Sequence, residues 1–241
     1  MQTIDLNCDM GEGMGNDADI MPFISSANIA CGYHAGGGDI MKASVQLALK
    51  HDVAIGAHPG FADKQNFGRL EQTLPLQQLY DLIAEQIYIL QKITDSFGTK
   101  LHHVKPHGAL YNMAAKDKAM ADAIVKAVKD VDEKLVLYGL YNSFIISAAQ
   151  EIGLKTANEV FADRRYNSDA TLVTRSMQGA VIEDIDKAIE QVHEMIYNKR
   201  VKTINGEIIP IHAQTICLHG DGKNAVDFAK WINRVVGIAL L

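Results

Sequence analysis

The sequence predicts an α/β fold in which a parallel β-sheet closes, or nearly closes, into a barrel. Short apolar runs alternate with longer segments of helical pattern about seven times along the 241 residues, as in chains built from strand–helix units. The apolar runs are nearly unbroken, which is typical of strands that are covered on both faces. No linker rich in Gly, Ser or Pro divides the chain, so we predict one domain over residues 1–241.

The individual elements follow from these patterns in chain order. The apolar runs predict strands at residues 3–8, 27–31, 53–57, 101–104, 135–138, 155–160 and 214–218. The segments of helical pattern predict helices at residues 39–51, 76–97, 116–131, 143–152, 182–198 and 224–240. Helix 76–97 has the clearest signal, because its leucines and isoleucines recur at near-helical spacing. Pro75 before it and Gly98 after it are typical of a helix start and a helix C-cap.

Composition and charge exclude several classes of protein. Hydrophobic residues make up 48% and charged residues 22% of the chain, so it can bury a sizeable core. The net charge is −6 and the basic residues are scattered, which argues against a nucleic-acid partner. The longest stretch without charged residues, 20–38, contains a proline and three consecutive glycines, which argues against a membrane span. Three dispersed cysteines and an acidic N-terminus indicate a cytoplasmic protein with reduced thiols.

Polar and ionisable side chains lie at the ends of six of the seven predicted strands. Because the carboxyl ends of parallel strands share one face, we expect these side chains to line a common rim. Four of the histidines are followed within two residues by glycine, which allows tight turns and close approach of the backbone to a ligand. The predicted rim residues are Asn7, Asp9, Glu12, His34, His58, Lys105, His107, Glu159, Arg164, His219 and Asp221.

Several chemistries fit this rim. Histidines and carboxylates can act as general acid and base on an attacking water. Lys105 and Arg164 can hold a carboxylate or a phosphoryl group. Alternatively, Asp9 with two histidines can bind a divalent metal that activates water; no HExxH-type signature is present, so we assign no residue to a metal. Neither GxGxxG nor GxxxxGK[ST] occurs, so we do not expect ATP to bind through either motif.

Some of these side chains also have simpler structural explanations. Any one of the rim histidines can be a hydrogen-bonded structural residue, and we expect His51, His102, His103, His193 and His212 to be structural or solvated. Asp39 follows a glycine run and is expected to cap a helix. Asp163 is expected to orient Arg164 or Arg165, and Cys31 to be a small buried residue at a strand end. Lys126 and its neighbours are expected to form a solvated helix face.

Six motifs, in order along the chain, resemble those of the LamB/YcsF family. They are LNCDMGEG, SSANIACGYHAGG, IGAHPGF, HVKPHGALYN, EVFADRRY and CLHGD. Together they extend from the first residues toward the C-terminal helix, and such a set is very specific. The resemblance implies an irregular seven-stranded parallel (βα) barrel of the glycoside hydrolase/deacetylase type, in agreement with the number of strands predicted above.

The resemblance also implies a reaction. Members of this family are the A subunit of the prokaryotic ATP-dependent 5-oxoprolinase, which cleaves 5-oxo-L-proline to L-glutamate and hydrolyses ATP to ADP and phosphate. The A subunit works there with the B and C subunits, which are expected to phosphorylate the lactam before the A subunit opens the ring. ATP is thus a cofactor of the complex, and a divalent metal stays an open alternative.

The expected roles can be placed on the rim residues. We expect Asp9, Glu12, His34, His58, Lys105 and His107 to be catalytic. We expect Asn7, Glu159, Arg164, His219 and Asp221 to bind substrate. Two competing interpretations stay open: a metal-dependent hydrolase or deacetylase that acts alone, and a non-catalytic subunit that binds a small carboxylated ligand.

Overall fold

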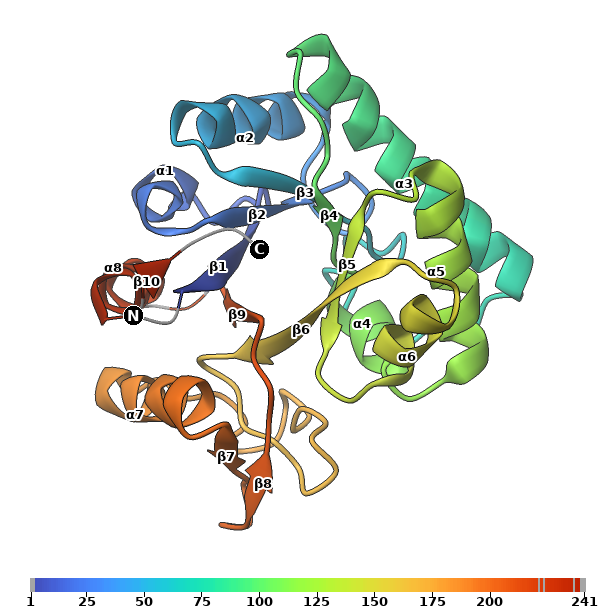
Figure 1. Cartoon of the computed structure of the whole chain (residues 1–241). Coiled ribbons are helices and arrows are strands. Elements are labelled where there is room, and N and C mark those ends of the chain that lie inside the picture. Colours follow the sequence, from blue (N-terminus) through green and yellow to red (C-terminus); the bar gives the residue numbers. More distant parts are fainter. Residues whose placement is uncertain (1–2, 221, 223, 236, 239–241) are drawn as a thin grey trace.

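Seven parallel strands form a closed barrel in the computed structural model, which describes residues 3–220, 222, 224–235 and 237–238. The barrel strands are β1 (Thr3–Met10), β2 (Ser26–Ala30), β3 (Ala54–His58), β4 (His103–Val104), β5 (Val136–Leu140), β6 (Lys155–Phe161) and β9 (Thr215–Leu218). Each pairs with the next in that order, and β9 pairs with β1 to close the ring, as Figure 1 shows from one end. The predicted fold class is therefore confirmed.

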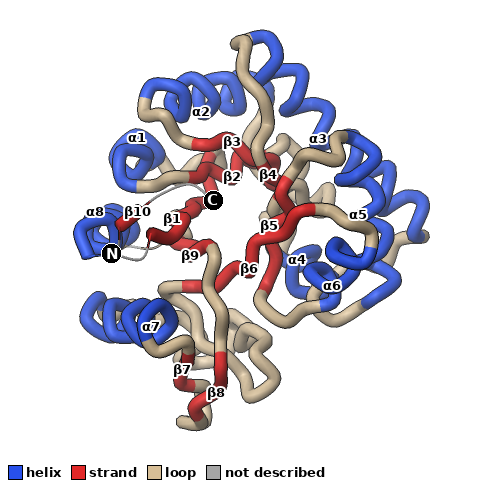
Figure 2. The backbone as a smooth tube through the Cα atoms, viewed as in Figure 1, coloured by secondary structure: helices blue, strands red, loops and turns tan. Residues whose placement is uncertain are grey.

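Helices surround the barrel (Figures 1 and 2). The longer ones are α2 (Gly38–Lys50), α3 (Leu76–Ser96), α5 (Lys118–Val131), α6 (Phe144–Glu151), α7 (Ile185–Tyr197) and α8 (Ala225–Val235). Short helices α1 (Asp17–Ile20), η1 (Met21–Phe23) and α4 (Gly108–Ala114) lie between strands, and a hairpin of β7 (Arg200–Lys202) and β8 (Ile208–Pro210) extends away from the barrel. Among the described residues, no helix has both the length and the apolarity that crossing a membrane requires.

Amphipathic patterning explains how the outer helices attach. In α5, Ala121, Ile124 and Val128 are buried at helical spacing while the lysines of the opposite face are exposed. Helix α3 begins directly after Pro75, and Gly98 follows its end with φ +70°. That left-handed backbone conformation is one that glycine adopts without strain. The sequence-based start and stop signals of this helix are therefore confirmed.

The structure corrects three local expectations. The last helix does not continue to residue 240: α8 ends at Val235, and Gly237–Ile238 form strand β10 beside β1. Strand β9 pairs with β1 only from Asp5 onward, so β10 supplies the neighbour for Thr3 and Ile4. A short apolar segment can form a helix or a strand, because its periodicity cannot distinguish the two.

The other two corrections concern the start of α2 and the presence of α4. Gly37, not Asp39, occupies the N-cap position of α2, and Asp39 lies in the first turn, where a carboxylate interacts favourably with the helix dipole. Helix α4 lies in a segment where the sequence predicts no element. Its seven residues are too few to show a clear period.

The interior of the barrel is polar and fully buried. Seven side chains form a hydrogen-bonded group, the inner network, which comprises Asp5, Asn7, Ser26, Asn28, His103, Tyr138 and Thr215. Asp5 accepts hydrogen bonds from the hydroxyls of Ser26 and Thr215 at 2.6 and 2.5 Å. The network fills the barrel beneath the rim residues and fixes their strands relative to one another.

Candidate active site

Lys105 follows β4 directly and lies inside the barrel, where its side chain is buried. Its ammonium donates to Asp9 Oδ1 at 2.9 Å and to Asn7 Oδ1 at 3.2 Å. It also forms an ion pair with Glu159 Oε1 at 2.9 Å. Burial alone lowers the pKa of Lys105, but the Asp9 carboxylate, the Cys217 sulfur and the Glu159 carboxylate outweigh that effect and hold the pKa well above its ordinary value. The lysine charge thus compensates two buried carboxylates.

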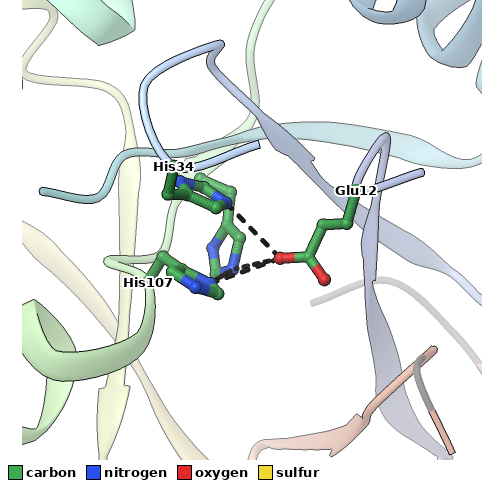
Figure 3. A group of neighbouring side chains, drawn as sticks. Glu12, His34 and His107 are labelled. Carbon is green, nitrogen blue, oxygen red and sulfur yellow. Dashed lines mark hydrogen bonds and ion pairs between the residues drawn. The ribbon is translucent and has the colours of Figure 1, made fainter. Parts of the chain in front are cut away.

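Above Lys105, the loops after β1, β2 and β4 and the last residue of β3 bring together Glu12, His34, His58 and His107, which we call the histidine cluster (Figure 3). The Glu12 carboxylate points toward the rings, with Oε1 3.4 Å from His34 Nε2 and 3.3 Å from His107 Nδ1. The same oxygen lies 3.9 Å from His58 Nε2, and Asp9 Oδ2 lies 3.4 Å from that nitrogen. One ligand atom from each of the four residues lies within 4.8 Å of all the others.

Backbone carbonyl groups fix the orientation of two of these rings. His58 Nδ1 lies 2.7 Å from the carbonyl oxygen of Lys105, and His107 Nε2 lies 2.8 Å from that of Phe67. The rings of His34 and His107 stack, with centroids 3.8 Å apart. Burial lowers the pKa of His34 to about 3 and that of His107 well below its ordinary value. Both rings are therefore neutral near pH 7.

Two glycines make room for the stacked rings. A Cβ atom at position 60 would lie 2.7 Å from His34 Nδ1, and one at position 68 would lie 2.8 Å from His34 Cβ. Gly68 also has φ +63°, a conformation that L-residues rarely adopt. Gly60 and Gly68 are therefore needed for the rings to pack this closely.

The loops after β6 and β9 contribute a second histidine–carboxylate pair. His219 Nδ1 lies 3.0 and 2.9 Å from the two oxygens of Asp163, and its ring stacks on Phe161. Asp163, which was expected to orient an arginine, thus accepts hydrogen bonds from His219. Because Nδ1 carries the donated hydrogen, Nε2 is the basic nitrogen of this ring.

A cluster of positive charge lies beside that pair. Arg164 is 5% exposed and donates from Nη2 to the carbonyl oxygen of Val173 at 2.6 Å. Burial and the neighbouring guanidinium of Arg175 lower the pKa of Arg164. Two adjacent arginines in a protein of net charge −6 mark a local site that favours an anion.

These groups surround one cavity of about 660 Å³. Its lining includes members of the histidine cluster together with the His219 and Arg164 side chains. The cationic side chains in the lining are Arg69, Lys105, Lys116, Arg164 and Arg175. A cavity of this size accommodates a small metabolite together with the group that activates it.

Comparison with known proteins agrees with the motifs. A sequence profile of the LamB/YcsF family matches residues 4–239. The chain belongs to the LamB/YcsF family. The 5-oxoprolinase A subunit of Tolumonas auensis is 50% identical to this family member over 95% of the chain and 93% of the relative. The 5-oxoprolinase A subunit of Shouchella clausii is 53% identical, with the same two shares covered.

Solved structures of other proteins share the barrel fold of this chain. The lactam utilization protein of Thermus thermophilus superposes with a TM-score of 0.91, is 37% identical, and covers 99% of both chains. A protein of Enterococcus faecalis V583 has a TM-score of 0.58 at 9% identity, which shows the shared fold alone. The fold that the resemblance implied is thus found in a solved relative.

In this LamB/YcsF member, nearly all of the predicted rim residues converge. Asn7 and Glu159 lie deeper, against Lys105, and Asp221 lies outside the described residues. Arg69 and Arg175 also line the cavity but were not predicted, because neither lies next to a predicted strand. The remaining predicted residues in or around the cavity are Asp9, Glu12, His34, His58, Lys105, His107, Arg164 and His219.

Proposed function

We propose that this chain is the ring-opening component of an ATP-dependent 5-oxoprolinase and acts with the partner B and C subunits on 5-oxo-L-proline. One observation carries the proposal: relatives about 50% identical over nearly the full length bear the name of the 5-oxoprolinase A subunit. A name that designates one lettered subunit implies a multi-subunit assembly.

The chemistry of the lactam supports a division of labour. A five-membered lactam is an unreactive amide, so its oxygen is first phosphorylated by ATP, with release of ADP, to create a leaving group. Water then adds to the activated carbon, and the C–N bond breaks as the nitrogen takes a proton. A second water releases phosphate from the resulting glutamyl phosphate and gives glutamate. The chain contains neither common nucleotide-binding motif, so the proposal places phosphorylation on the B and C subunits.

Arg164 and Arg175 are the proposed anchor for the anionic part of the substrate, either its carboxylate or its phosphoryl group. Both line the cavity, and both offer planar donor sets that match these groups. Lys105 contributes differently from the expectation based on sequence, because Asp9 and Glu159 already occupy its ammonium. Its proposed role is to keep those carboxylates ionised at the floor of the cavity.

Both histidine groups contribute side chains to the cavity lining and support the proton transfers. We assign protonation of the departing nitrogen to His219, which Asp163 orients through Nδ1. We assign activation of the attacking water to the histidine cluster together with Asp9, which lies 3.4 Å from His58 Nε2. These two assignments give the acid and the base to different side chains that line the same cavity.

The test is glutamate formation from 5-oxoproline and ATP, with and without the B and C subunits. We expect turnover only in the complete mixture. Arg164→Met should reduce turnover roughly ten- to a hundredfold, because a charged hydrogen bond is worth about 1.5–3 kcal/mol. Arg200→Met is the matched control, since Arg200 is paired with Glu194 on the exposed surface. Unchanged turnover in Arg164→Met would show that Arg164 does not anchor the anionic part of the substrate.

A second candidate is favoured by the histidine cluster alone: a metal-dependent hydrolase that acts without partners. It predicts amide or ester hydrolysis by the isolated chain without ATP. Glutamate production by the isolated chain from 5-oxoproline, independent of ATP, would favour this candidate over the three-subunit enzyme.

A further inference from the structure

The hydrogen positions in the histidine cluster follow from its backbone contacts. Carbonyl oxygens only accept hydrogen bonds, so His58 Nδ1 and His107 Nε2, which contact the carbonyls of Lys105 and Phe67, must carry the hydrogens. In neutral rings the opposite nitrogens, His58 Nε2 and His107 Nδ1, then carry lone pairs. These two nitrogens lie only 2.9 Å apart. Two lone pairs that face each other at this distance repel, unless a cation or a proton lies between them.

His34 adds a third nitrogen donor to the same position. Its side chain is 1% exposed, and neither ring nitrogen has a hydrogen-bond partner among the described residues. Leaving buried polar atoms without a hydrogen bond destabilises a folded protein. His34 Nε2 nonetheless faces Glu12 Oε1 at 3.4 Å, as Figure 3 shows. The ring is thus directed at the carboxylate without a hydrogen bond that would explain its position.

The spacing of the four groups fits a metal ion. Ligands about 2.0–2.2 Å from a tetrahedral Zn²⁺ lie roughly 3.3–3.6 Å from one another. Glu12 Oε1 lies 3.4, 3.3 and 3.9 Å from the nitrogens of His34, His107 and His58. Two of these separations, 3.4 and 3.3 Å, match those of ligands that share one ion, whereas 3.9 Å is longer and the 2.9 Å between His58 Nε2 and His107 Nδ1 is shorter. Small shifts of the rings would complete the arrangement.

We propose that Glu12, His34, His58 and His107 bind one divalent transition-metal ion, with Zn²⁺ preferred over Mg²⁺. Three imidazoles and one carboxylate suit Zn²⁺, whereas Mg²⁺ prefers an all-oxygen set. The contacts of His58 Nδ1 and His107 Nε2 with backbone carbonyls are the outer hydrogen bonds that usually orient metal-binding histidines. A metal bound there would activate water at the edge of the cavity.

A second group of possible ligands, Asp9, Cys217 and His219, is less suitable. The Lys105 ammonium lies 2.9 Å from Asp9 Oδ1 and 3.0 Å from Cys217 Sγ, and its positive charge repels a cation. His219 Nδ1 is already bonded to Asp163. The histidine cluster is therefore the more suitable metal site of the two.

The direct test measures metal binding by the isolated full chain, without substrate, ATP or partner proteins. Its outcome is therefore independent of the proposed function. The chain is stripped with a chelator and titrated with Zn²⁺ or Mg²⁺ by calorimetry, and its metal content is measured by mass spectrometry. We expect one tightly bound Zn²⁺ per chain and far weaker Mg²⁺ binding. Co²⁺ in place of Zn²⁺ should give the visible absorption bands of tetrahedral nitrogen and oxygen coordination.

Variants locate the ion. His58→Gln and Glu12→Gln should each weaken Zn²⁺ binding at least tenfold. Circular dichroism monitors folding, and Glu12→Gln at the cavity edge is the safer variant if His58→Gln does not fold. His212→Gln is the matched control, because His212 is exposed, and it should bind Zn²⁺ like the parent. The absence of stoichiometric Zn²⁺ binding, or parent-like affinity in both ligand variants, overturns the proposal and leaves a shared proton between His58 and His107.

Discussion

The inner network and the histidine cluster are both buried, both polar and only a few residues apart along β1, β2 and β4, yet their bonding differs. In the inner network, every buried side-chain nitrogen and oxygen has a hydrogen-bond partner. In the histidine cluster, both nitrogens of His34 lack one, and two nitrogens of neighbouring rings face each other. A fully bonded polar group stabilises the fold, whereas an incompletely bonded one is available to a ligand.

Lys105 joins the two regions, so its removal is expected to have the largest effect. Lys105→Met leaves Asp9 and Glu159 buried without their cation, and breaking a buried ion pair costs about 3–5 kcal/mol. We expect the free energy of unfolding, measured in urea, to fall by about that amount. Lys126→Met on the exposed face of α5 is the matched control and should leave the unfolding midpoint unchanged. A Lys105→Met protein as stable as the parent would contradict the role of the lysine as the compensating charge.

Asp5→Asn tests whether the inner network is structural. The carboxylate accepts hydrogen bonds from Ser25, Ser26 and Thr215, and hydrogen bonds to a charged group are worth about 1.5–3 kcal/mol. We expect a loss of stability in that range, with Zn²⁺ binding by the histidine cluster retained. Asp39→Asn, on the exposed surface of α2, should change stability by less than about 0.5 kcal/mol. An Asp5→Asn protein that is as stable as the parent but has lost Zn²⁺ binding would show that the inner network supports metal binding and not the stability of the fold.

Acid should destabilise the protein through histidines in both regions. Burial holds the pKa of His103 well below its ordinary value, so the unfolded chain binds a proton there that the folded chain does not. The free energy of unfolding therefore falls as the pH drops below about 6.5, by up to about 1.4 kcal/mol per pH unit for each such group. His103→Gln should reduce this pH dependence of the unfolding free energy by roughly the contribution of one such group. Equal slopes for the parent and His103→Gln would show that His103 titrates normally in the folded protein.

The smallest effect is expected for His34→Leu in metal-free protein. Removing two nitrogens that lack hydrogen bonds gains about 1–3 kcal/mol, while losing the ring contact with His107 costs about 0.5–1.5 kcal/mol. The net change in unfolding free energy should lie between a loss of about 0.5 and a gain of about 2.5 kcal/mol, centred near about 1 kcal/mol. Asn28→Leu, the same kind of substitution in the inner network, should cost more, because Asn28 bonds Asn7 and His103. A larger loss of unfolding free energy for His34→Leu than for Asn28→Leu would contradict the distinction between the fully bonded inner network and the incompletely bonded histidine cluster.

Local patterns account for most of the fold. Each of the seven apolar runs corresponds to a barrel strand, because a strand covered on both faces has an unmistakably apolar sequence. The hairpin of β7 and β8 was not predicted, since each strand has three residues, too few to show a clear period. Position after a strand was also enough to predict that His34, His58 and His107 share one rim, because parallel strands end on the same face.

The partners of each rim residue, by contrast, depend on tertiary structure. Lys105 could be predicted to lie at the rim, but its ion pairs join residues 96 and 54 positions away, and no local pattern encodes such distances. The same holds for Asp163 with His219, which are 56 residues apart. The sequence by itself determined the strands and the face on which the chemistry lies, because strand burial and chain direction are local properties. Only closure of the barrel decided which charges compensate one another and which nitrogens lack partners, because those depend on distances across its interior.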